Sequence, residues 1–91
     1  MYEIRFTKTY RKSYTRVSQY KNFDSAILET VIDVLQSGKT LPQKYRDHQL
    51  SGALKEYREC HIKSDILLVY QKYDDVLILL LVDIGSHSSL F

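Results

Sequence analysis

The spacing of hydrophobic residues changes twice in the first half of the chain. Residues 2–6 alternate apolar and charged side chains, which is the period of a half-buried strand. From Thr7 to Val17 the apolar side chains recur at helical spacing instead. A second helical pattern occupies residues 25–37 and stops before Gly38, a residue that readily ends a helix. The first half therefore predicts one strand followed by two amphipathic helices.

The second half of the chain predicts strands. After a polar connection that contains Pro42, the residues with strand-like spacing are 55–62, 66–73 and 76–82. Asp74-Asp75 lies between the last two segments, where a tight hairpin turn is expected. This order predicts an α+β fold in which an N-terminal strand and two helices pack on one face of a small, mainly antiparallel sheet. The other face of that sheet is expected to be open to a ligand.

Length and composition narrow the class of protein. A chain of 91 residues is predicted to form a single domain, residues 1–91, because smaller pieces would bury too little apolar surface. The single cysteine, Cys60, excludes an internal disulfide framework and is expected to be a core thiol. The first residues lack the apolar stretch of a secretory signal, and the longest apolar run, 76–82, is far shorter than the ~20 residues of a membrane-spanning helix. We therefore expect a cytoplasmic protein without a membrane span.

Charge is distributed unevenly along the chain. Residues 1–46 hold nine Lys or Arg against four Asp or Glu, whereas the remainder is acidic. Part of this excess forms a stripe on the first predicted helix, made by Lys8, Arg11, Lys12 and Arg16. Clustered cations displace counterions from phosphates, so the stripe is a candidate surface for an anionic partner such as nucleic acid. The alternative is a solvated helix face without a partner.

The three histidines are the main candidates for chemistry. His48 precedes the last three predicted strands, His61 lies on the first of them, and His87 follows the last. Antiparallel pairing can bring such positions to one edge of the sheet, and Asp65 could join them. Groups that titrate near neutral pH suit acid–base cleavage of a phosphodiester. A metal site is the alternative, although none of the short His/Cys spacings of familiar zinc sites is present.

Three segments resemble the signature segments of the YafQ-type branch of the RelE/ParE toxin superfamily. They are Y-R-D-H-Q-L-S-G (45–52), R-E-C-H-I-K-S-D-I-L-L-V-Y (58–70) and G-S-H-S-S-L-F (85–91), and the similarity covers nearly the whole chain. The resemblance implies a RelE-like fold and the toxin of a type II toxin–antitoxin system. It also implies a ribosome-dependent, metal-independent endoribonuclease that cleaves translated mRNA without a cofactor. A DinJ/RelB-like antitoxin is expected to silence it in a hetero-oligomer, the free toxin being a monomer.

The resemblance also assigns site residues. It implies an active site that contains His48, His61, Asp65, His87 and Phe91, with Glu59 as a weaker candidate on the face of His61. The leading mechanism is attack by the RNA's own 2′-hydroxyl, with His87 as the acid and His48 or His61 as the base or as a transition-state donor. Asp65 would orient an imidazole or contact the nucleobase.

The aromatic residue Phe91 has two interpretations. Stacking on a nucleobase would contribute ~1–3 kcal/mol per base. The alternative is a plug that packs on the edge of the sheet beside Leu90.

Two positions depart from the resemblance. Asp83 stands where these toxins often carry an arginine, and Ile66 stands in place of a tryptophan. An arginine would stabilise charge on the scissile phosphate and an aspartate would oppose it, so Asp83 leaves reduced or absent cleavage open as an alternative to full activity. Candidate replacements for the arginine are Arg58, Lys63 and Arg46. Strand periodicity, however, places Arg58 on the opposite face of its strand from His61. Asp83 favours the alternative function, a ParE-like toxin or protein-interaction module that shares the fold but cleaves nothing.

Overall fold

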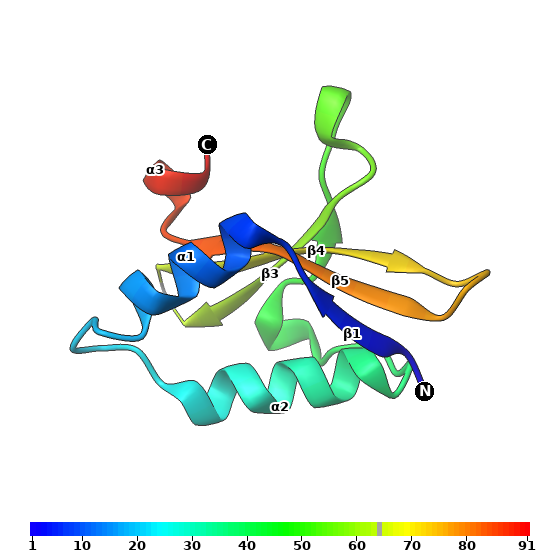
Figure 1. Ribbon diagram of the computed structural model, residues 1–91, viewed down its shortest axis with the longest axis horizontal. Coiled ribbons are helices and arrows are strands. Elements are labelled where there is room, and N and C mark those ends of the chain that lie inside the picture. Colours follow the sequence, from blue (N-terminus) through cyan, green and yellow to red (C-terminus); the bar gives the residue numbers. More distant parts are fainter. Residues whose placement is uncertain (64) are drawn as a thin grey trace.

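One mixed sheet of five strands forms the centre of the computed structural model, which describes residues 1–63 and 65–91 (Figure 1). The strands are β1 (Glu3–Phe6), β2 (His48–Gln49), β3 (Arg58–Lys63), β4 (Ile66–Tyr73) and β5 (Ile78–Gly85). Their order across the sheet is β1-β5-β4-β3-β2, with β1 parallel to β5 and all other neighbours antiparallel. The longest apolar run, 76–82, falls largely in β5, which lies between β1 and β4 and is hydrogen-bonded on both sides.

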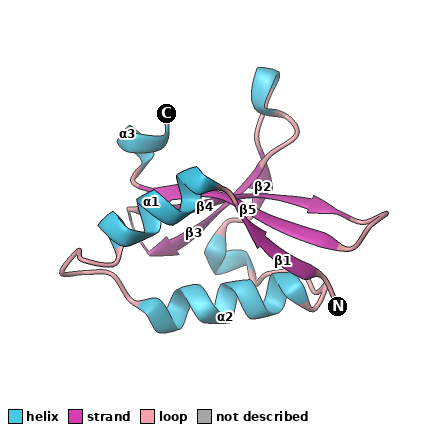
Figure 2. Ribbon diagram, in the orientation of Figure 1, coloured by secondary structure: helices cyan, strands magenta, loops and turns pink. Residues whose placement is uncertain are grey.

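Helices flank the sheet, as Figure 2 shows by colour. They are α1 (Lys8–Val17), α2 (Ser25–Gln36) and α3 (His87–Leu90), with short 3₁₀ turns at η1 (Gln43–Tyr45) and η2 (Gly52–Leu54). The first two begin at side-chain caps: Thr7 accepts a hydrogen bond from the Tyr10 amide, and Asp24 accepts one from the Ala26 amide. In the part of the chain that the structure describes, no helix is both long and apolar enough to cross a membrane.

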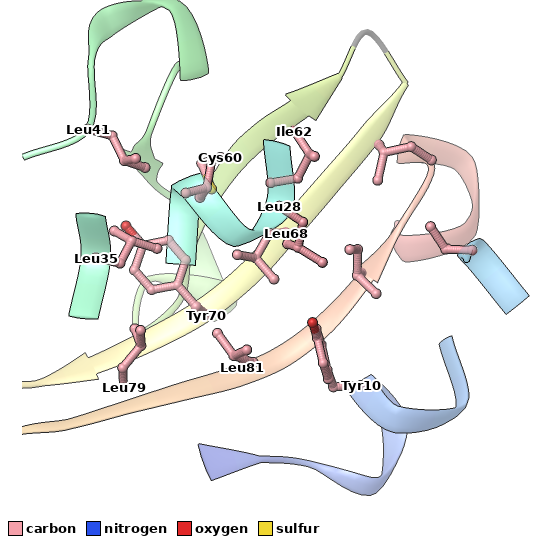
Figure 3. Packing of buried hydrophobic residues seen from close by; sticks show 14 residues of the cluster. Tyr10, Leu28, Leu35, Leu41, Cys60, Ile62, Leu68, Tyr70, Leu79 and Leu81 are labelled. Carbon is pink, nitrogen blue, oxygen red and sulfur yellow. The ribbon is translucent and has the colours of Figure 1, made fainter. Parts of the chain in front are cut away.

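The two faces of the sheet have different coverings. The helix face is covered by α1 and α2, and its core contains alternate residues of the strands, among them Cys60, Leu68 and Leu81 (Figure 3). The open face carries the other set of β4 side chains, including Leu67 and Val69. In the view of Figure 1, α2 lies below the strands, whereas α3 and the loop that holds η2 lie above them. The predicted α+β fold with two helices on one face of the sheet is confirmed, and the N-terminal strand β1 joins the sheet at its edge beside β5.

The structure differs from the sequence prediction at several boundaries. Strand β3 begins at Arg58 rather than residue 55, because turn hydrogen bonds occupy the amides of Lys55 and Tyr57. The turn between β4 and β5 takes four residues, 74–77, with Leu77 at a φ of 53°, so β5 begins and ends later than predicted. The two-residue strand β2 and the helix α3 were not predicted. As a consequence, the open face is partly covered.

Helix α3 packs closely on the end of β5. A Cβ atom added to Gly85 would lie 2.7 Å from the Ser89 Oγ and 3.6 Å from Leu90, so the absence of a side chain allows this approach. Ser86 caps the helix by accepting a hydrogen bond from the Ser89 amide. The chain therefore turns back over the open face after β5.

Candidate active site

The first histidine of the site is held by the loop before β2. Arg46 ends η1 in the left-handed conformation, with φ 51° and ψ 41°, and its carbonyl oxygen lies 2.7 Å from His48 Nδ1. Antiparallel pairing then sets His48 opposite Glu59 of β3. The ring of His48 is therefore directed across the strand pair toward Glu59, while half of its side-chain surface stays exposed.

Glu59 is the buried centre of the site. It is 6% exposed, and its Oε1 atom lies 3.3 Å from His48 Nε2 and 4.0 Å from His61 Nε2. Among the described residues, its Oε2 atom has no hydrogen-bond partner. Buried carboxylates are normally fully hydrogen-bonded, so this oxygen is an exception of the kind found at functional sites.

The contact between His48 and Glu59 requires a proton between them. A carbonyl oxygen only accepts, so His48 Nδ1 must donate to Arg46, and in a neutral ring the Nε2 atom then carries only a lone pair. A lone pair facing a carboxylate oxygen at 3.3 Å would be repulsive. A proton between the two atoms would instead join them in a hydrogen bond, so the two side chains are placed to exchange a proton.

Helix α3 supplies the other half of the site. His87 is its first residue, and Phe91 lies one turn later with the two ring centroids 5.5 Å apart. Phe91 is 51% exposed, so its ring is not packed as a buried plug, whereas Leu90 is partly buried. This exposure favours the stacking interpretation of Phe91, because a half-exposed ring is available to a base.

These groups meet around two adjoining hollows on the open face. The polar hollow, about 250 Å³, is lined by His48, Glu59, His87 and Phe91 together with Leu50, Ser51 and Leu54. The apolar hollow, about 170 Å³, shares Leu50, Leu54 and Phe91 with it and is completed by Tyr57, Val69, Val82, Asp83 and Leu90. A polar compartment beside an apolar one is suited to a reacting phosphate and an adjacent nucleobase.

Leu50, Leu54 and Tyr57 line these hollows but were not predicted as site residues. Leu50 and Leu54 lie in the connection before the predicted strand 55–62, and Tyr57 lies in the part of that predicted strand that precedes β3. The signal that could have identified them is their position between the D-H and E-C-H-I segments, since a connection between two site segments must pass the site.

Two of the predicted catalytic residues are placed less directly. His61 approaches the site through Glu59 but does not line the polar hollow. Asp65 lines a separate cavity of about 250 Å³ with Lys21, Lys63 and the aromatic residues Tyr20 and Phe23. The structure does not bring Asp65 to the polar hollow, because it follows β3, which runs away from Glu59 for about 3.3 Å per residue.

The cations proposed to replace the missing arginine are also apart from the hollow. Arg58 lies on the helix face, as the strand period predicted, and donates to Asp47 at 3.0 Å. Lys63 lines the cavity of Asp65, while Arg46 is exposed two residues before His48. Asp83 lines the apolar hollow beside Phe91, and its carboxylate accepts a hydrogen bond from the Ile84 amide.

The basic stripe and the cysteine occupy other parts of the molecule. Lys8, Arg11, Lys12 and Arg16 are all exposed on α1, on the helix side of the sheet, and Arg11 lies over the ring of Phe6. Cys60 is fully buried, and burial raises the pKa of its thiol. The predicted core role of Cys60 is confirmed. Within residues 1–63 and 65–91, no three His, Cys, Asp or Glu side chains are grouped so that they could hold a metal ion.

Comparison with known proteins identifies the family. Residues 2–91 match the family described as the bacterial toxin of type II toxin–antitoxin system, YafQ. This chain belongs to the YafQ family. It is therefore the toxin component of a type II toxin–antitoxin system, and the resemblance in the three sequence segments is confirmed.

Individual YafQ proteins support this placement. The mRNA interferase toxin YafQ of Escherichia coli K12 is 30% identical over 98% of this chain and 95% of its own length. The putative toxin YafQ of Haemophilus influenzae is 48% identical, but the match covers only 46% of this chain and 41% of that protein.

Solved structures extend the similarity to the fold. A metal-bound toxin from Helicobacter pylori has a TM-score of 0.90 and 42% identity, with both chains covered completely. The YafQ chain of the E. coli DinJ–YafQ complex has a TM-score of 0.84 and 27% identity over 100% of this chain and 99% of its own. The α+β fold predicted from the sequence is confirmed at this level.

Proposed function

We propose that this toxin is an endoribonuclease that cleaves mRNA during translation, with the polar hollow as its active site. The observation that carries the proposal is the convergence of His48, Glu59 and His87 on one hollow with Phe91 at its rim. The YafQ of E. coli is named an mRNA interferase, which indicates the class of reaction. RNA provides its own nucleophile, so acid–base groups and no covalent enzyme intermediate are required.

The reaction proceeds by proton transfer at two oxygens. The His48–Glu59 pair accepts the proton of a 2′-hydroxyl, and the resulting alkoxide attacks the adjacent phosphorus. The bond from phosphorus to the 5′-oxygen breaks as His87 donates a proton to that oxygen. The products are a 2′,3′-cyclic phosphate and a 5′-hydroxyl end. In this scheme Glu59, and not Asp65 as expected from the sequence, orients the catalytic imidazole.

The remaining candidates support the reaction from outside the polar hollow. His61 provides a second imidazole for the buried Glu59 carboxylate, 4.0 Å from its Oε1 atom. Phe91 stacks on a nucleobase that enters the apolar hollow, and Asp65 contacts the message farther along, beside Lys21 and Lys63.

The partners of the toxin follow from its family. The E. coli relative is found in a DinJ–YafQ complex, so an antitoxin of DinJ type is the expected partner here. Ribosomal RNA is proposed to bind the exposed stripe of Lys8, Arg11, Lys12 and Arg16 on α1. The free toxin is expected to be a monomer in the cytoplasm and to enter a hetero-oligomer with its antitoxin.

The decisive test is cleavage of a ribosome-bound message, read by primer extension. The parent should produce discrete cuts, and His87→Ala should lower the rate by about 10²–10⁴-fold, the usual contribution of a general acid. Ser88→Ala, an exposed neighbour on α3, is the matched control and should cut like the parent. A 2′-deoxynucleotide at the cut position should abolish cleavage, and chelation of divalent ions after ribosome assembly should leave it unchanged. Equal cutting by His87→Ala would reject the proposal.

A second candidate function is a toxin of the same fold that binds a protein target without cleaving RNA. Asp83 favours it, because its carboxylate lines the apolar hollow and brings negative charge next to the polar hollow, where a phosphate would need positive charge. Asp83→Arg separates the two functions. Faster cleavage by this variant indicates a nuclease weakened by Asp83. Growth arrest without cuts from either the parent or the variant indicates the protein-binding toxin.

A further inference from the structure

A second carboxylate lies directly before His48 and points to the other side of the sheet. Asp47 accepts a hydrogen bond from Arg58 Nη2 at 3.0 Å through Oδ2 and one from the Tyr70 hydroxyl at 2.5 Å through Oδ1. Arg58 and Tyr70 are register partners on β3 and β4. The Asp47 side chain is 17% exposed, and Tyr70 is fully buried in the core. The three side chains therefore join the start of β2 to the interior of the sheet.

We propose that Asp47, Arg58 and Tyr70 form a clamp that positions His48 and fixes which of its ring nitrogens carries the proton. None of the three side chains lines the polar hollow, so they are positioning residues and not catalytic ones. The effect of the clamp on cleavage rests on the proposed function, in which His48 is the base. Nothing in the sequence segments pointed to this role for Asp47 or Tyr70.

The backbone between the clamp and the imidazole explains how the position is transmitted. Arg46 is held at φ 51°, a left-handed conformation that is unfavourable for a non-glycine residue and persists only where its surroundings impose it. Asp47 is the next residue and is anchored through both carboxylate oxygens. This anchor holds the Arg46 carbonyl where His48 Nδ1 donates to it at 2.7 Å.

The Arg46 carbonyl thereby selects the tautomer of His48. With Nδ1 committed to that oxygen, Nε2 is the nitrogen that faces Glu59 Oε1. The titratable groups around this nitrogen are Glu59 and His61 from β3 and His87 from α3. If the anchor were lost, the loop could relax from its strained conformation, and Nε2 would no longer be directed at Glu59.

The two donors of the clamp keep one protonation state near neutral pH. The hydrogen bond to Asp47 raises the pKa of Arg58, which stays charged. Burial, and then the bond to Asp47, raises the pKa of Tyr70, which stays a neutral donor. Neither donor therefore adds a titration of its own beside His48.

The test combines the ring NMR of His48 with cleavage kinetics of Asp47→Ala. Nitrogen–proton correlation spectra of the free toxin report which ring nitrogen is protonated, and they require neither RNA nor ribosomes. In the parent, neutral His48 should be the Nδ1–H form, whereas Asp47→Ala should give a mixture of tautomers. At saturating ribosomes the cleavage rate should fall about 10- to 100-fold, the size expected for a displaced group, while the half-saturating ribosome concentration stays unchanged.

Two further variants keep the result decisive. Tyr70→Phe removes one clamp hydroxyl but retains the buried ring, and it should shift the tautomer and the rate in the same direction by a smaller factor. It decides the matter if Asp47→Ala does not fold. Asp33→Ala, an exposed carboxylate on α2, is the control and should match the parent.

The outcomes separate the clamp from the proposed function. A folded Asp47→Ala with the parent's tautomer and rate would overturn the clamp. A changed tautomer in a toxin whose parent form cuts no message would support the clamp and reject the nuclease.

Discussion

Two carboxylates near the β2–β3 edge have opposite surroundings on the two faces of the sheet. On the helix face, Asp47 uses both oxygens, one for Arg58 and one for Tyr70. On the open face, the more deeply buried Glu59 has one oxygen near two imidazoles and another without a partner among the described residues. Arg58 and Glu59 are consecutive residues of β3, so a single strand carries both arrangements.

The difference in hydrogen bonding indicates that Asp47 contributes to the stability of the fold and Glu59 to its function. A paired carboxylate with its hydrogen bonds satisfied stabilises the fold that contains it, since breaking the network would leave a buried charge. A carboxylate with an unsatisfied oxygen does not optimise stability, because burying it without partners is unfavourable. Such a group is retained where its reactivity matters. The comparison predicts that the two faces respond oppositely to substitution.

Glu59→Gln should have the largest effect on cleavage. The amide keeps the size of the side chain but cannot share a proton with His48, so the cleavage rate should fall about 10²–10⁴-fold. The free energy of unfolding should stay equal or rise by about 1 kcal/mol, because a partly unpaired buried charge is removed. Primer extension and urea titration measure the two quantities.

Glu56→Gln provides the matched control for this experiment. Glu56 is exposed, and it precedes Glu59 by three residues. This variant should resemble the parent in both measurements. A Glu59→Gln toxin that cuts normally but unfolds more easily would show that the buried carboxylate is structural.

The helix face should show the reverse pattern. Leu68 is fully buried between β3 and β5, and truncation to alanine should lower the free energy of unfolding by about 2–5 kcal/mol. The rate of cleavage per folded molecule should be unchanged, since Leu68 packs in the core of the helix face (Figure 3) and lines neither hollow. Val76→Ala, at a 59% exposed turn residue, should alter neither quantity. A slower rate in fully folded Leu68→Ala would show that the two faces are coupled.

The sequence correctly predicted the helices and strands whose spacing and capping signals lie within their own segments. The helices α1 and α2 were found because their apolar spacing and capping residues lie within the segments themselves. The start of β3 was predicted too early, because the strand-like alternation continues into residues whose amides bond within a turn. Helix α3 was missed because four residues are too few to show a helical period.

The site depended on contacts that no local pattern encodes. Strand alternation correctly placed Glu59 and His61 on one face, and the family resemblance pointed to His48 and His87. The register that sets His48 against Glu59 involves β2, which is only two residues long. The irregularity of β3 after His61 and the course of the strand away from β2 explain why Asp65 lies in another cavity.

Charge reversal on α1 should have the smallest effect and concerns binding alone. Lys12 and Arg16 are exposed on the helix, one turn apart. Lys12→Glu with Arg16→Glu should weaken ribosome association several-fold at low salt, and the difference should shrink as salt screens the charges. Co-sedimentation with ribosomes over a salt series measures the effect, while thermal unfolding should be unchanged.

The control must change the net charge equally at another surface. Lys39→Glu with Lys55→Glu alters two exposed lysines outside α1 and should bind ribosomes more tightly than the α1 variant. Equal weakening by both pairs would mean that the overall charge of the toxin, and not the stripe, attracts ribosomal RNA. Parent-like binding of the α1 variant would make the stripe a solvated helix face. The open face would then have to supply the contacts that hold the toxin on the ribosome.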